Sequence, residues 1–262
     1  MRERDRCWVR SARAAIGCLL LLLLAPFHAD AAPVEVRFLE GITRGFLVLR
    51  SITGEAVAYG DLIQTAHPDR VESQMVFRFK DGSLYDERVT FSQQHVFTLL
   101  SYRLIQKGPS FPEPLDVSFD RKGHYQVKSV EKGREETSNG TLDLPADVYN
   151  GMTVMILRNL PAGGAATVHY VAFTPTPRVI KLELAPVGEQ KVRLGELETH
   201  ATRFAVKAKL GSLEGIVAAV LGKKPSEYEC VIWTKDVPAF IRCEGPLRPK
   251  GPVYRFELVN FR

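Results

Sequence analysis

The stretch RVIKLELA, residues 178–185, alternates between apolar and polar side chains. Ile180, Leu182 and Leu184 fall on one face, with charged side chains between them. A period of two places every second side chain on the same side of an extended chain, so this pattern predicts a strand with one buried and one solvated face. Two further stretches show the same alternation, RFAVKAKL at residues 203–210 and VYRFEL at residues 253–258.

Turn signals separate the alternating runs. Lys80-Asp81-Gly82-Ser83 lies between Gln74–Phe79 and Leu84–Phe91, and Asp-Gly between two such runs is a strong hairpin signal. About a dozen strands follow, joined by links too short for parallel crossovers, so the sheet should be antiparallel. The other breaks fall at Ile52–Glu55, Lys107–Pro109, Arg121–Gly123, Pro161–Gly164, Pro175–Pro177 and Pro186–Gly188.

Two stretches have the pattern of helices instead. Pro145–Leu160 carries apolar side chains four residues apart, among them Val148, Met152 and Ile156, which predicts a helix buried on most sides. Ser212–Leu221 predicts a second, short helix, because Ser212 is a suitable N-cap and a glycine follows its last residue.

These elements predict a mainly β fold. A flat sheet of a dozen strands would curl or split, so we expect a large, curved antiparallel sheet, a barrel or half-barrel, wrapped around the buried helix Pro145–Leu160. The alternative is a pair of adjacent sheets, divided near residues 161–166.

The first 31 residues have the pattern of an export signal. Five arginines precede an apolar run that contains Leu19–Leu24, and Ala29-Asp30-Ala31 offers small residues to a signal peptidase. The apolar run is too short to span a bilayer. We therefore expect cleavage before Ala32, a single β-rich domain over residues 32–262, and a soluble exported protein without a membrane span.

Only Cys230 and Cys243 remain after this cleavage. They flank an expected hairpin, Glu227–Thr234 and Ala239–Glu244, and lie equally far from the midpoint of its turn at residues 235–238. Direct cross-strand neighbours are close enough to bridge, so we expect a structural disulfide worth about 3 kcal/mol. A redox-active pair or two free thiols are the alternatives.

Charge and motifs exclude several classes of function. The full chain carries a net charge of +5, of which the signal contributes +2, and the remaining +3 is too small and too dispersed for a nucleic-acid binder. The familiar nucleophile, zinc and phosphate-loop motifs are absent, so we expect no catalytic residues, no metal and no cofactor. Asp86 and Glu87 lie beside a hairpin, but as strand neighbours they should point to opposite faces of the sheet. The histidines of the mature chain occur singly, at His67, His95, His124, His169 and His200.

The chain resembles a family of exported bacterial proteins of unknown function. The resemblance implies an all-β domain in the periplasm of a Gram-negative cell, and it brings no established activity and no catalytic residues. The stretches that carry it are Phe91-Ser92-Gln93, Gln106–Pro112, Asp143-Leu144-Pro145, Asn150-Gly151-Met152, Phe240 and Glu244–Leu258.

Our leading hypothesis for function is the binding or carriage of an apolar or amphipathic ligand, such as a lipid, in the periplasm. A curved sheet closed by an apolar helix, without a catalytic set, motivates it. The alternative is an envelope assembly or protein-interaction module without a small ligand, and a hydrolytic enzyme ranks third. The wall residues expected to contact the ligand are Phe77, Phe79, Met152, Ile156, Phe204 and Val206.

Overall fold

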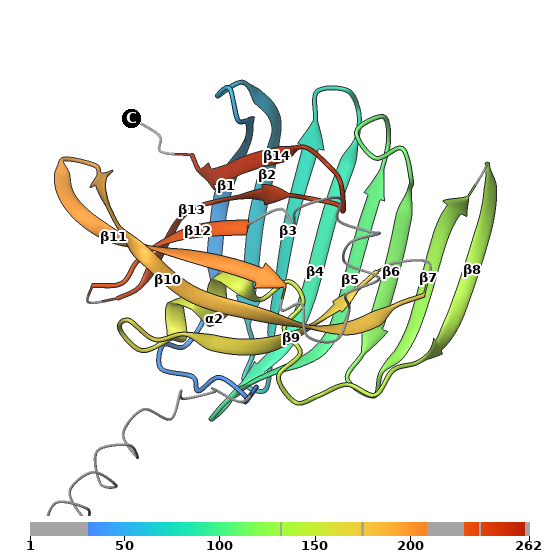
Figure 1. The fold of residues 1–262 in the computed structure, drawn as a ribbon, viewed down its shortest axis with the longest axis horizontal. Coiled ribbons are helices and arrows are strands. Elements are labelled where there is room, and N and C mark those ends of the chain that lie inside the picture. The colour runs from blue at the N-terminus through green and yellow to red at the C-terminus, as the bar shows by residue number, and fades with distance from the viewer. Residues whose placement is uncertain (1–30, 132, 174–175, 209–227, 236, 260–262) are drawn as a thin grey trace, which may run out of the picture. The chain divides into compact units, whose positions relative to one another are not determined.

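A single antiparallel sheet of fourteen strands dominates the computed structural model, which describes residues 31–131, 133–173, 176–208, 228–235 and 237–259 (Figure 1). The strands are β1 (Thr43–Ser51), β2 (Ala56–Ala66), β3 (Val71–Phe79), β4 (Leu84–Gln93), β5 (Phe97–Lys107), β6 (Leu115–Asp120), β7 (His124–Glu131), β8 (Arg134–Thr141), β9 (Ala166–Ala172), β10 (Arg178–Leu194), β11 (Leu197–Ala208), β12 (Tyr228–Trp233), β13 (Ala239–Pro246) and β14 (Val253–Leu258). The mainly β, antiparallel prediction is confirmed.

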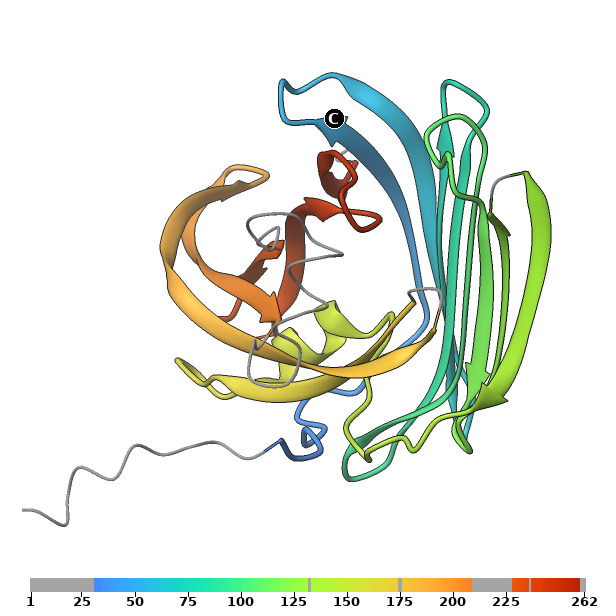
Figure 2. The same ribbon diagram turned by 45° about the vertical axis from the view of Figure 1, so that its right-hand side comes forward.

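The sheet consists of two meanders joined at their outer members. Strands β1 to β8 pair in sequence order, as do β9 to β14, and β1 pairs with β14, so the order runs from β8 through β1 and β14 to β9. The division into two separate sheets near residues 161–166 is therefore not what the chain adopts. The first meander forms a tall wall, and the curved second meander lies in front of it in Figure 1 and to its left in Figure 2. The ends of this order, β8 and β9, do not pair with each other, so the curved sheet is a half-barrel that is not closed.

Local turn chemistry explains the hairpins. Between β3 and β4, the Phe79 amide donates to the Ser83 carbonyl, and Gly82 adopts a φ of 84° that favours glycine. One predicted break is wrong. Pro186–Gly188 does not end a strand but forms a β-bulge inside the long strand β10, where an extra residue in one strand is accommodated without ending the pairing.

The buried helix is shorter than predicted. Helix α2 spans Thr153–Asn159, because the preceding residues bond to strand β9 and not to one another in a helical pattern. The Tyr149 amide donates to the His169 carbonyl, and the Asn150 side chain both donates to and accepts from the Val171 backbone. These contacts pair backbone groups of β9 that, at the end of the sheet, have no neighbouring strand.

The other predicted helix, Ser212–Leu221, lies outside the described residues. No helix in the described part of the chain is long and apolar enough to cross a membrane.

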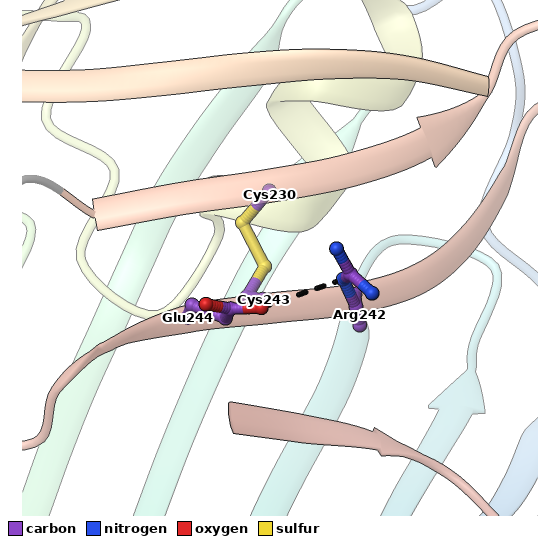
Figure 3. The surroundings of a disulfide bond; sticks show 4 residues. All are labelled: Cys230, Arg242, Cys243 and Glu244. Atoms are coloured by element: carbon purple, nitrogen blue, oxygen red, sulfur yellow. Dashed lines mark ion pairs between the residues drawn. A yellow bond between two sulfur atoms is a disulfide. The ribbon is translucent and has the colours of Figure 1, made fainter. Parts of the chain in front are cut away.

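The predicted disulfide is present. Cys230 and Cys243 are direct partners across β12 and β13, with their Cα atoms 4.1 Å apart (Figure 3). This spacing matches the closer, non-hydrogen-bonded kind of antiparallel pair. The pairs nearest the turn, such as Ile232 with Phe240, are one residue out of the register that places Cys230 opposite Cys243. A β-bulge between Val231 and Ile232 corrects this register, so the pairing of the cysteines depends on the strands as well as on the turn.

A cluster of buried polar side chains around Glu40 connects the segment before β1 to the rest of the fold. The Glu40 side chain is 3% exposed and accepts hydrogen bonds from Arg158 Nη1 of helix α2 and from Gln64 Nε2 of β2, each at 3.0 Å. Arg158 Nε donates to the Pro238 carbonyl at 2.8 Å, and the Gln93 side chain bonds to the Glu40 backbone. One side-chain cluster thus connects the helix, strands β2 and β4 of the first meander and the β12–β13 hairpin.

Candidate ligand-binding site in the sheet interior

The six predicted wall residues all lie in one buried hydrophobic cluster. None of them is more than 8% exposed. They come from three places: Phe77 and Phe79 from β3, Met152 and Ile156 from the start and middle of the α2 region, and Phe204 and Val206 from β11. The fold therefore brings together side chains that are far apart in sequence, and they pack against one another.

A row of less completely buried side chains crosses the same face of the sheet. Leu62, Met75 and Glu87 are register partners on β2, β3 and β4, so their side chains share a face. The next partner in the row is Leu104, which belongs to the buried core, so this face is the interior one. Leu62, Met75 and Glu87 nevertheless keep intermediate exposure. Accessible surface therefore remains beside this row.

Glu87 is the carboxyl in this row. Its Oε1 atom accepts a hydrogen bond of 2.8 Å from the Tyr102 hydroxyl, and the Tyr85 hydroxyl is close enough to lower its pKa. Burial raises the pKa of Glu87 above the ordinary glutamate value, and the two hydroxyls offset only part of that rise. Glu87 is thus a desolvated carboxyl that keeps intermediate exposure on the interior face of the sheet.

Four tyrosines surround this carboxyl from both meanders. Tyr85 and Tyr102 extend from the first wall, and Tyr170 on β9 and Tyr228 on β12 reach the same region from the second. Burial is the main cause that raises the pKa of each hydroxyl, and the nearby Glu87 charge adds to the rise. The Tyr102 hydroxyl is also close enough to Tyr170 to offset part of the rise in the Tyr170 pKa, so residues of both meanders influence one another here. All four hydroxyls therefore remain neutral donors through the physiological pH range.

Aromatic rings surround the network. The Tyr102 ring stacks on Phe173 with its centroid 5.9 Å away, and the Tyr228 ring lies 6.4 Å from Phe256. Tyr85 lies 6.1 Å from Phe77, one of the predicted wall residues. The interior thus combines an apolar, aromatic lining with one carboxyl and its hydroxyl partners.

This combination suits the binding of a ligand with an apolar body and one polar group. Most ligand sites are lined by apolar and aromatic side chains, with a few polar groups that set orientation. A carboxyl with a raised pKa in such a site is a recognised marker of a functional position. The sequence alone contains a signal for Glu87. Glu87 interrupts the inward-facing series Tyr85, Val89 and Phe91 with a charge.

A pocket of about 500 Å³ lies along β4 to β7, lined mainly by side chains of the opposite face but also by Tyr102 and Phe119, whose side chains belong to the buried core. Arg88 and Arg103 are cross-strand partners there, and each makes a two-point ion pair with a carboxylate of the same face, Asp86 and Asp116 respectively. This confirms that Asp86 and Glu87 point to opposite faces. None of the six predicted wall residues contributes to this pocket, whose lining residues are Arg88, Thr90, Ser101, Tyr102, Arg103, Ser118, Phe119, Asp120 and His124.

The histidines form no shared site in the described part of the chain. His169 and Asp147 are 2.8 Å apart, at the contact between β9 and the segment before α2, and His124 bonds to Asp120 in the β6–β7 turn. Among the residues that the structure describes, no group of three or more His, Cys, Asp or Glu side chains is placed to hold a metal ion.

Comparison with known proteins gives a likeness in structure but none in sequence. No family model matches the chain, and no curated protein matches its sequence. The chain is similar in structure to a crystallised β-barrel-like protein of the domain of unknown function DUF1849 from Brucella abortus. The match has a TM-score of 0.47 and 10% sequence identity, and it covers 83% of this chain and 95% of that chain. This likeness concerns the arrangement of strands and assigns no ligand or activity.

Proposed function

We propose that this chain is an exported protein of the periplasm that binds an apolar or amphipathic ligand, such as a lipid, inside its curved sheet. The observation that carries the proposal is the row Leu62, Met75 and Glu87, which faces the interior and yet keeps accessible surface. In a solidly packed interior such a row would be buried throughout, as Leu104 is.

The proposed site has an apolar body and a polar end. Leu62 and Met75 contact the apolar part of the ligand, next to the six wall residues of the buried hydrophobic cluster. Glu87 and the Tyr102 hydroxyl bond to its polar group. The disulfide between Cys230 and Cys243 fits export, since such bonds persist in oxidising compartments.

Native mass spectrometry of the protein purified from its own periplasm tests this proposal. Cleavage before Ala32 gives a defined polypeptide mass, and a bound ligand gives a discrete excess that lipid extraction removes. We expect Leu62→Trp to abolish the excess, because the larger ring fills the interior space. Ile63→Trp is the matched control, since the next residue of the same strand points outward and is 40% exposed. A bare polypeptide mass, unchanged after incubation with envelope lipids, would overturn the proposal.

A second candidate function, a protein-interaction module of the envelope, rests on strand β8. It forms one end of the sheet, and seven of its eight residues are exposed. An open edge strand can pair with an extended segment of another protein. Photo-crosslinking groups placed at Thr137 would capture such a partner in the periplasm, whereas the same group at Ile63 on the outer face of β2 would not. Equal crosslinking from both positions would count against a partner at this edge.

A further inference from the structure

Glu87 is an interior carboxyl without a described cationic partner. Burial and the hydroxyls of Tyr102 and Tyr85 account for its environment, and no Lys or Arg of the described residues forms an ion pair with it. Two other buried carboxylates differ in this respect. Glu40 is paired with Arg158, and Asp86 with Arg88. A desolvated carboxylate is costly unless a cation or several hydrogen bonds compensate it.

We propose that the interior site selects a ligand with a positively charged amine or quaternary ammonium group, for which Glu87 is the counter-ion and the surrounding tyrosines form an aromatic lining. This inference rests on the proposed interior binding site and names the chemistry of the polar end of its ligand. An uncharged polar group would need only the hydroxyls. A bound cation would form the ion pair that no described Lys or Arg makes with Glu87.

The aromatic surroundings favour a cation over an anion. The face of an aromatic ring carries a partial negative charge and attracts ammonium groups, more strongly where water is excluded. Tyr85, Tyr102, Tyr170 and Tyr228 all lie close enough to Glu87 for its charge to raise their pKa values. A negatively charged head group would meet this carboxylate directly, so the site discriminates against anionic ligands.

The binding of a cation should depend on pH in one direction. The titratable groups that face Glu87 are Tyr85 of its own strand, Tyr102 of β5, Tyr170 of β9 and Tyr228 of β12, and these stay neutral up to high pH. Among the residues that the structure describes, Glu87 is therefore the group through which the charge of the site changes. As pH rises through the pKa of this carboxyl, it becomes negative and its affinity for a cation increases.

Calorimetric titration with two amphiphiles of equal chain length tests the inference. Dodecyltrimethylammonium carries a fixed positive charge, and the dodecyl ether of octaethylene glycol is uncharged; both are titrated below the concentrations at which they form micelles. We expect the wild-type protein to bind the cation about tenfold or more tightly at pH 8 than at pH 4, and the neutral ether equally at both.

Two variants separate the carboxyl from general effects of charge. Glu87→Gln should lower the affinity for the cation about tenfold at pH 8 and have little effect on it at pH 4, where the carboxyl of the wild-type protein is already largely protonated. Asp86→Asn makes the same charge change one residue away on the outer face and should alter neither titration.

The outcomes distinguish the two proposals. Equal affinity for both amphiphiles, without pH dependence in the wild-type protein, overturns cation selection but leaves the interior site in place. Binding of neither amphiphile overturns both proposals. The comparison of the two pH values in the wild-type protein decides the question even if Glu87→Gln does not fold.

Discussion

Replacing Arg158 with methionine leaves the Glu40 carboxylate without a cation in a site where the Glu40 side chain is only 3% exposed. The substitution keeps the apolar stem of the side chain on helix α2 and removes two kinds of hydrogen bond. Nη1 no longer donates to the two Glu40 oxygens at 3.0 Å, and Nε no longer donates to the Pro238 carbonyl at 2.8 Å. The bond from Gln64 to Glu40 remains.

We expect this change to lower the free energy of unfolding by about 3 kcal/mol. Breaking a buried ion pair by removing one partner costs about 3–5 kcal/mol. The lower end applies here, because the Arg158 side chain is 22% exposed and water can partly solvate the site. For a protein of this size, a loss of about 3 kcal/mol lowers the melting temperature by about 6–12 °C.

Urea denaturation of four proteins measures the effect: the wild-type protein, Arg158→Met, Glu40→Gln and the double variant. In the Glu40→Gln background the buried charge is gone, so Arg158→Met should cost only about 1 kcal/mol, which leaves a coupling energy of about 2 kcal/mol. The slope of stability against urea should stay constant across the set. An equal cost of Arg158→Met in both backgrounds, or a cost below about 0.5 kcal/mol in the wild type, would refute the reasoning.

Three further predictions concern other parts of the fold. Joint replacement of Cys230 and Cys243 by alanine should lower the free energy of unfolding by about 3 kcal/mol, since the bridge closes a loop with a sequence separation of 13; the measurement is urea denaturation against the oxidised wild type. Gly151→Ala should cost about 2 kcal/mol in the same assay, because a φ of 72° is unfavourable for alanine and its Cβ would lie 3.3 Å from the Tyr102 ring. The Glu87 pKa is raised in the folded state, so its contribution to stability is full below the ordinary glutamate pKa of 4.5 and is lost as pH rises through the higher folded value. The melting temperature of Glu87→Gln should therefore rise relative to that of the wild type between pH 4 and pH 8. A difference in melting temperature that does not change with pH would contradict this prediction.

The local elements of this protein could be predicted from its sequence. The hairpin around Lys80–Ser83 and the alternation in Arg178–Ala185 depend on side chains within a few residues of one another. The structure has the hairpin between β3 and β4, and Arg178–Ala185 lies in strand β10. The pairing of Cys230 with Cys243 is similarly local, because a hairpin fixes which residues stand opposite each other. In each case the signal and the structure lie within the same short segment.

The candidate site could be predicted only in part. Alternation places Glu87 on the inward face of β4, but the tyrosines of β9 and β12 approach it only after the second meander has curved across the first. The pattern of Pro145–Leu160 predicted a helix throughout, and contacts with β9 changed its first half into turns.

The amino-acid sequence by itself determined the strands, their turns and the antiparallel direction of the sheet, because these follow from the period of the side chains and the conformations of glycine and proline. Only the tertiary structure decided that β1 pairs with β14, that Glu40 meets Arg158 across 118 residues, and that Glu87 lies without a described cationic partner among tyrosines. Such contacts depend on how the whole sheet curves, and the curvature is set by the packing of all fourteen strands together and not by any one of them.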